Sequence, residues 1–147
     1  MLSAESLAQI NREIAKYPPD HKESAVMAAL RIAQVEKGWL STETMDFIAH
    51  YLEMPPIAVY EVASFYNMYE LQPVGKYKIN VCTNLSCTLV GAVDLVEHLK
   101  SHLGIELGET TDDGKFTLRE SECMGACGDA PLCTLNNHKM FSFLTPE

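Results

Sequence analysis

Four cysteines of this sequence stand in two close pairs, spaced as metal ligands often are. Cys82 and Cys87 form a C-x4-C pair, and Cys123 and Cys127 form a C-x3-C pair farther along the chain. Thiolate sulfur is a preferred protein ligand for Zn²⁺ and for the iron of iron–sulfur clusters. One short segment can hold each pair, whereas bringing the two pairs together requires a folded domain behind them. The pattern therefore predicts a four-thiolate site.

The residues around the second pair favour an iron–sulfur cluster. Gly125 and Gly128 lie on either side of Cys127, and glycines allow a positive φ and let backbone N–H groups approach sulfur closely. Such N–H···S hydrogen bonds stabilise the extra electron density of a reduced cluster. Structural zinc is the direct competitor, because cysteine pairs of similar spacing bind it. A redox-active dithiol is a weaker hypothesis, since the sequence has no C-x-x-C motif.

The remaining cysteine and the histidines give weaker signals. Cys133 alternates with its neighbours in a predicted strand, where it is expected to act as a small buried hydrophobic residue. His98 and His102 share one face of a predicted helix; a metal pair is conceivable there, but a solvated face is favoured. His21 and His50 stand alone and are expected at the surface or at helix caps. Five cysteines are an odd number, which argues against a disulfide framework.

Composition excludes several classes of function. The chain has 147 residues and a net charge of −9, from 11 Lys and Arg against 20 Asp and Glu, and its basic residues form no run. Nucleic-acid binding is therefore not expected. No apolar run approaches the ~20 residues of a membrane span, and the N-terminus lacks the form of a signal peptide. We expect a globular cytoplasmic protein, free or bound to a larger assembly.

The first half of the sequence predicts four short helices. Apolar residues recur at spacings of three and four in segments 3–17, 20–38, 41–52 and 56–66. The residues expected to begin or end these helices are Ser3, Pro18, Asp20 with Glu23 as a capping box, Gly38, Ser41 and Pro55. Short connections between short helices indicate a small four-helix bundle over residues 1–72.

The second half predicts a mixed layer of strands and helix. The expected strands are residues 76–81, 115–119, 132–135 and 140–144, and the expected helix is 93–103. The first cysteine pair then lies on the loop that leaves the first strand, and the second strand leads to Cys123. Residues 66–75 lose the helical period and carry Pro and Gly, which marks a domain boundary. The fold class is α+β, with an α/β domain over residues 73–147.

The two cysteine motifs and parts of the first half resemble those of a known family. Residues 82–87 (CTNLSC) and 122–131 (ECMGACGDAP) are similar to the cysteine motifs of the thioredoxin-like 2Fe–2S subunit of NADH:quinone oxidoreductase (respiratory complex I), the E or 24-kDa type. Residues 38–40 (GWL), 62–66 (VASFY) and 72–75 (QPVG) look like the bundle and linker of that family. The resemblance covers essentially the whole chain.

The resemblance implies a fold, a cofactor and a partner. It implies a helical bundle followed by a thioredoxin-like domain with one 2Fe–2S cluster, held by Cys82, Cys87, Cys123 and Cys127. The chain would be an electron carrier within an enzyme, exchanging single electrons with the FMN of a flavin-bearing, NADH-binding partner subunit (the F or 51-kDa type). It would bind neither NADH nor FMN itself; no G-x-G-x-x-G motif is present. Its expected place is the peripheral arm of a membrane-bound complex, on the cytoplasmic side of the inner membrane in a bacterium, without insertion into the membrane.

Two departures and two alternatives accompany this interpretation. The family usually continues past residues 144–147 into a C-terminal helix, for which this sequence has no residues, and it more often has a plain hydrophobic residue at Cys133. One alternative is the equivalent subunit of an NAD-linked hydrogenase or formate dehydrogenase. An alternative of another class is a zinc-stabilised structural adaptor without redox function.

Overall fold

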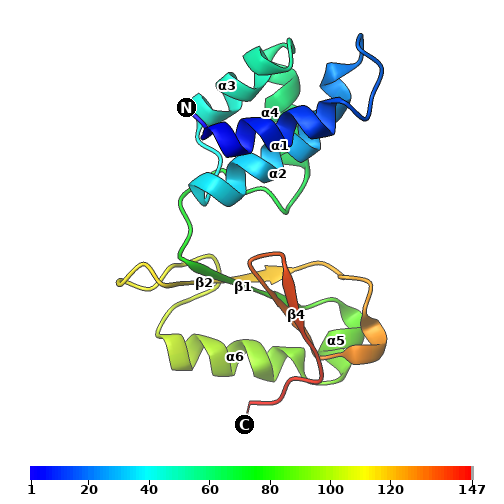
Figure 1. Ribbon diagram of the computed structural model, residues 1–147. Helices are drawn as coiled ribbons and strands as arrows, with labels where there is room; N and C mark the ends of the chain where they lie inside the picture. Colours follow the sequence, from blue (N-terminus) through cyan, green and yellow to red (C-terminus); the bar gives the residue numbers. More distant parts are fainter. Residues whose placement is uncertain (147) are drawn as a thin grey trace. The chain divides into compact units, whose positions relative to one another are not determined.

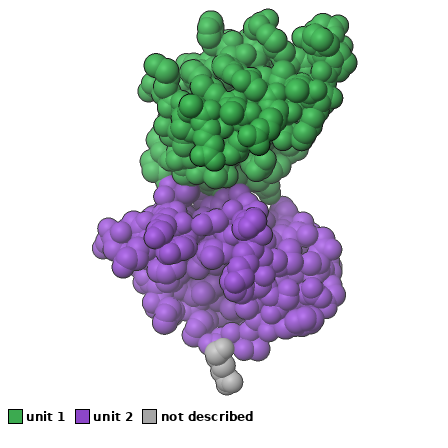
Figure 2. Space-filling model, viewed as in Figure 1, with its two compact units in different colours: residues 1–73 green, residues 74–147 purple. Residues whose placement is uncertain are grey.

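The computed structural model describes residues 1–146, and its fold is α+β, as predicted. The chain divides into two compact units, one from Met1 to Pro73 and one that begins at Val74 (Figure 2). The first unit contains helices α1 to α4, and the second contains α5, α6 and a four-stranded sheet (Figure 1). Within the described residues, no helix has the length and apolar character needed to cross a membrane.

Three of the predicted caps, Ser3, Gly38 and Ser41, are present in the first unit. The helices of this unit are α1 (Ala4–Ile14), the 3₁₀ helix η1 (Lys22–Ala25), α2 (Val26–Lys37), α3 (Thr42–Tyr51) and α4 (Pro56–Phe65). The Ser3 and Ser41 hydroxyls accept hydrogen bonds from the backbone N–H groups of Ser6 and Thr44, each at 3.2 Å. Gly38 ends α2 with a φ of 83°, which a glycine adopts without steric penalty.

The predicted capping box at Asp20 and Glu23 is wrong. α2 begins only at Val26, and the residue before it makes no side-chain capping hydrogen bond. The chain first forms a turn, in which the His21 N–H donates to the Pro18 carbonyl at 2.9 Å, and then the 3₁₀ helix η1. Because the proline pair forces this turn before a helix can form, Asp20 lies too far from α2 to cap it.

A single hydrophobic core fills the first unit. Its largest fully buried side chains are Ile10, Leu30, Leu40, Ile48, Leu52 and Val59. The segment after α4 belongs to this core as well, because Tyr69 is buried in it and its hydroxyl donates to the Met27 carbonyl at 2.8 Å. The Leu40 N–H also donates to the Glu70 carbonyl at 2.7 Å. The first unit therefore extends through these residues to the linker.

The second unit is a sheet with a helix packed on it. Its elements are β1 (Tyr77–Cys82), α5 (Leu85–Leu89), α6 (Ala92–Leu103), β2 (Phe116–Ser121), the 3₁₀ helix η2 (Cys127–Asp129), β3 (Cys133–Leu135) and β4 (Lys139–Phe141). The strand order is β2-β1-β3-β4; β1 and β2 are parallel, and the other pairs are antiparallel. Val81 of β1 and Leu118 of β2 share a core with Leu95 and Val96 of α6.

Candidate metal centre

The parallel pairing of β1 and β2 brings the two cysteine segments together. Cys82, the last residue of β1, lies opposite Ser121, the last residue of β2. The carboxyl ends of the two strands therefore meet at one edge of the sheet, which is where α/β folds usually hold ligands. The first pair begins at the end of β1, and the second pair begins at Cys123, two residues after the end of β2. In Figure 1, α5 lies beside the orange segment that carries the second pair.

The first pair is buried, and a short helix holds its second member. Cys82 is the last residue of β1 and Cys87 lies within α5, so the prediction that this pair lies on a loop is wrong for both cysteines. Asn84 begins the helix, and its carbonyl accepts from the Thr88 N–H at 3.0 Å. Burial raises the pKa of the Cys87 thiol from 9.0 to about 11, and a hydrogen bond with the Cys82 thiol and the charges of Cys82 and Cys127 add to this. The protonated form of this thiol is therefore favoured.

The second pair is exposed, and its sulfurs are 3.4 Å apart. Gly125 has a φ of 77°, and its N–H donates to Cys123 Sγ at 3.4 Å. This hydrogen bond lowers the pKa of Cys123, whereas the hydrogen bond with Cys123 raises the pKa of Cys127. The predicted N–H···S contact is thus present at Gly125. Gly128 lies inside η2, and its φ is not positive.

Side chains that no sequence motif indicated join the two cysteine segments. Asn84 Nδ2 donates to Glu122 Oε2 at 2.9 Å, and Thr83 Oγ1 donates to Glu120 Oε2 at 3.3 Å. A hydrogen bond from Ser86 counteracts the rise in the Cys127 pKa. These residues could have been suspected only from their positions beside the cysteines, because their partners depend on how the two strands pair.

The second cysteine segment also packs against the first. Cys82 and Cys87 share a small core with Leu132, against which Met124 and Ala126 of the second segment pack. The charge of Cys82 acts on Cys127, which places thiols of both pairs within electrostatic reach of one another. The structure therefore brings all four predicted residues to one end of the second unit.

The spacing of the sulfurs fits two thiolates on one metal of a cluster. Two thiolates on one tetrahedral metal, each ~2.3 Å from it, are about 3.8 Å apart, close to the 3.4 Å between Cys123 and Cys127. A 2Fe–2S cluster takes two thiolates on each iron, and the two cysteine pairs supply two thiolates each. The donor set therefore fits a 2Fe–2S cluster.

The other residues considered in the sequence lie elsewhere. Cys133 is buried in the core with α6, which confirms the prediction of a small buried side chain, and burial raises its pKa. The rings of His98 and His102 stack on the exposed side of α6, with their centroids 6.0 Å apart. His21 Nδ1 lies 3.1 Å from Glu23 at the surface of the first unit.

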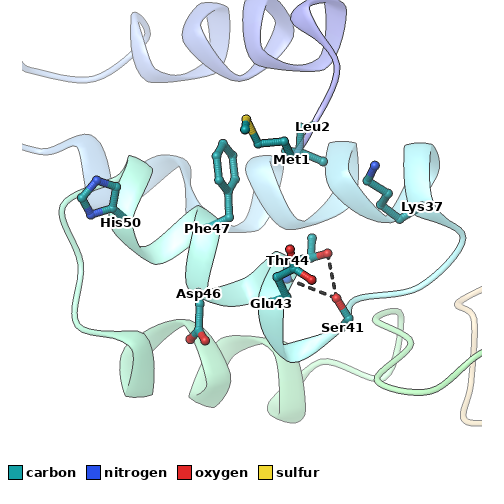
Figure 3. Close-up of a pocket in the computed structure, with 9 residues that line it drawn as sticks. All are labelled: Met1, Leu2, Lys37, Ser41, Glu43, Thr44, Asp46, Phe47 and His50. Carbon is teal, nitrogen blue, oxygen red and sulfur yellow. Dashed lines mark hydrogen bonds between the residues drawn. The ribbon is translucent and has the colours of Figure 1, made fainter.

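A cavity of about 530 Å³ lies in the first unit, near the N-terminus and α3 (Figure 3). Its lining combines apolar side chains such as Phe47 with charged ones such as Lys37 and Asp46, and it includes His50. Ser41, at its edge, is already engaged with Thr44, as the dashed lines in Figure 3 mark. None of the cysteines contributes to this cavity.

Comparison with known families agrees with the geometry of the thiols. The model of the thioredoxin-like [2Fe-2S] ferredoxin family matches residues 10–147. The chain belongs to this family. The resemblance drawn from the sequence is thereby confirmed, and the cofactor is a 2Fe–2S cluster.

Two relatives of this chain carry the names of NADH dehydrogenase proteins. The E-type subunit of the NADH-quinone oxidoreductase of Rickettsia felis is 48% identical over 125 residues, covering 84% of this chain and 75% of that protein. Mitochondrial NADH dehydrogenase [ubiquinone] flavoprotein 2 of Dictyostelium discoideum is 43% identical over 134 residues. That match covers 90% of this chain, which spans about half (54%) of the Dictyostelium protein.

A solved structure shares the fold. The air-oxidised NAD⁺-reducing [NiFe]-hydrogenase contains a chain that matches with a TM-score of 0.71 and 23% sequence identity. The match covers 82% of this chain and 20% of the hydrogenase chain. At this level of identity the likeness establishes the arrangement of helices and strands.

Proposed function

We propose that Cys82, Cys87, Cys123 and Cys127 hold one 2Fe–2S cluster, and that this chain is the electron-transfer subunit of an NADH:quinone oxidoreductase. One observation carries the proposal: the two cysteine pairs meet at the carboxyl ends of β1 and β2 in a family of 2Fe–2S proteins. The chain acts as a one-electron carrier inside a larger enzyme and is not a complete catalyst.

The two cysteine pairs differ in their exposure to water, and Gly125 stabilises charge on one sulfur. When bound, a 2Fe–2S cluster accepts and releases one electron at a time. Cys82 and Cys87 are buried, so their side of the site is screened from water, whereas Cys123 and Cys127 face outward. The Gly125 N–H donates to Cys123 Sγ and thereby stabilises negative charge on that sulfur. The exposed pair is therefore the side from which a redox partner gains access.

The partner in this proposal is a flavin-bearing, NADH-binding subunit, whose FMN exchanges electrons with this chain. The names of the Rickettsia and Dictyostelium relatives support membership of an NADH dehydrogenase complex. The place proposed for the chain is the peripheral arm of that complex, on the cytoplasmic side of the inner membrane in a bacterium.

A second candidate function is the equivalent subunit of an NAD⁺-reducing hydrogenase. The observation that favours it is the shared fold with the hydrogenase chain. Its sequence identity of 23% is about half that of the Rickettsia relative, so we place the oxidoreductase first. Copurification of this chain from its source separates the two, because a nickel–iron subunit accompanies it only in a hydrogenase.

The test is a metal analysis of the anaerobically purified chain. We expect two irons and two acid-labile sulfides per chain, with a rhombic S = 1/2 EPR signal after reduction by dithionite. One zinc and no sulfide, persisting after an attempt at cluster reconstitution, would overturn the electron-transfer function and leave a structural adaptor.

A further inference from the structure

An exposed apolar patch lies next to the thiol centre. It consists of Leu85 and Leu89 on α5, Val90 directly after α5, and Val93 at the start of α6, each with between 51% and 77% of its surface exposed. Isolated apolar side chains are common on protein surfaces, whereas a group of them marks a surface that binds something. We call these four residues the α5 patch.

The α5 patch covers the outer side of the helix that holds a proposed ligand. Cys87 lies in the middle of α5 and is 1% exposed, while Leu85 and Leu89, four residues apart on the same helix, are 70% and 77% exposed. Residues at i and i+4 share one helical face. α5 therefore directs its thiol toward the site and its two leucines toward solvent, so whatever covers these leucines lies one helix away from Cys87.

The charged residues of the segments that carry the α5 patch and the cysteine pairs have a single sign. Residues 79–99 and 120–138, which carry both cysteine pairs and the patch, contain no lysine or arginine. The same stretches contain five carboxylates: Asp94, Glu97, Glu120, Glu122 and Asp129. Thr83 and Asn84, the two residues before Leu85, donate hydrogen bonds to Glu120 and Glu122. The patch is thus an apolar centre bordered by acidic groups.

We propose that the α5 patch is the surface on which the redox partner docks, and that the partner presents an apolar surface bordered by lysine or arginine. The proposal rests on the function proposed above and specifies how that partner binds. Protein interfaces combine an apolar centre with a polar rim, and opposite charges on the rim increase the rate of association. A partner bound there sits beside the exposed cysteine pair, where electron exchange requires it.

The charge pattern argues against two other occupants. A second copy of this chain, docked through the same patch, would place two acidic rims against each other. A membrane surface rich in anionic lipid would likewise be repelled. A basic protein surface is the occupant that the charges favour.

The test uses the purified, cluster-loaded full chain and, as the probe, the purified flavin-bearing NADH-binding subunit of the same source. Leu89→Lys and Leu89→Asp are compared with Val35→Lys, a matched control, because Val35 on α2 is 78% exposed and Leu89 is 77% exposed. We expect Leu89→Lys to raise the dissociation constant about tenfold or more. Leu89→Asp should raise it less, because aspartate keeps attraction to a basic rim, and Val35→Lys should leave it within about twofold. Raising the salt concentration should weaken binding of the wild-type chain.

Several results would overturn the proposal. If Phe65→Lys, on an 80% exposed residue of α4, weakens binding and Leu89→Lys does not, the partner docks on the bundle. Dimers of the wild-type chain that Leu89→Lys dissociates in sedimentation experiments would assign the patch to a second copy. Equal increases in the dissociation constant for Leu89→Asp and Leu89→Lys would contradict a basic rim on the partner. The EPR signal of each variant is recorded in parallel, so that absence of a cluster in the wild-type chain is recognised as a failure of the proposed function and not of the docking surface.

Discussion

Cys133 is buried, as Cys82 and Cys87 are, but its surroundings differ. It shares the core with α6 and pairs with Val81 across the sheet, whereas the first cysteine pair shares a separate small core with residues of the second cysteine segment. A buried thiol among apolar side chains is a small hydrophobic residue, whereas a thiol that faces other thiols can bind a metal. The position of a cysteine relative to the other sulfurs therefore distinguishes a metal ligand from a small core residue.

This difference leads to a prediction for single substitutions. Cys82→Ala and Cys127→Ala each remove one of four thiolates, so we expect loss of the 2Fe–2S cluster. Cys133→Ala removes only a small buried group, so the cluster should be retained, with a loss of about 1 kcal/mol in the free energy of unfolding. Iron and sulfide content and the EPR spectrum measure the outcome. A cluster retained in either ligand variant, or lost in Cys133→Ala, would show that the ligand set is wrong.

At the scale of the elements, one carboxylate joins the first two long helices. Glu36, near the end of α2, accepts the Ser3 backbone N–H on both oxygens, at 3.1 and 2.9 Å, where α1 begins. A carboxylate is favourable at a helix N-terminus, whose free N–H groups carry partial positive charge. Hydrogen bonds from the Ser6 side chain, the Ser3 backbone and Lys37 lower the pKa of Glu36 from 4.5 to about 2.

The depressed pKa predicts a dependence of stability on pH. Because the folded state favours ionised Glu36, its contribution to stability is present above pH 4.5 and is lost as the pH falls toward 2. Glu36→Gln should therefore lower the urea midpoint at pH 7, and the difference from wild type should shrink between pH 4.5 and 2. Circular dichroism of the metal-free protein measures this. Glu61→Gln, which removes the same charge from the exposed side of α4, is the control; an equal effect would argue against the role of Glu36.

Elements with strong local signals were predictable, and those that depend on tertiary contacts were not. Ser3 and Ser41 precede regular apolar periods, so the starts of α1 and α3 follow from the sequence. α5 has five residues, too few for a period to appear. The hydrogen bond between Asn84 and Glu122 depends on the pairing of β1 with β2, which no local pattern contains. The cysteine pairs were predictable because their spacing is itself the chemical signal.

At the scale of the whole molecule, each unit has a core of its own. The core of the first unit draws only on residues up to Tyr69, and both cores of the second unit draw only on residues from Ile79 onward. A domain of about 70 residues gains only ~3–5 kcal/mol from a single core, and binding of a metal centre adds stability directly to the folded state. The second unit should therefore depend on its cluster more than the first does.

We accordingly predict that a fragment starting at Val74 binds a 2Fe–2S cluster and is folded only while the cluster is present. Gly75 donates its N–H to Thr117 Oγ1 at 2.6 Å, and Lys76 donates its N–H to the Gly114 carbonyl at 3.1 Å. A fragment starting at Tyr77 lacks both bonds and should melt at a lower temperature, which makes it a matched comparison. Iron content, EPR and thermal unfolding with and without chelator measure these outcomes. A Val74 fragment that stays folded after the iron is removed would mean that its apolar cores suffice, and one that never takes up iron would mean that the first unit helps to form the site.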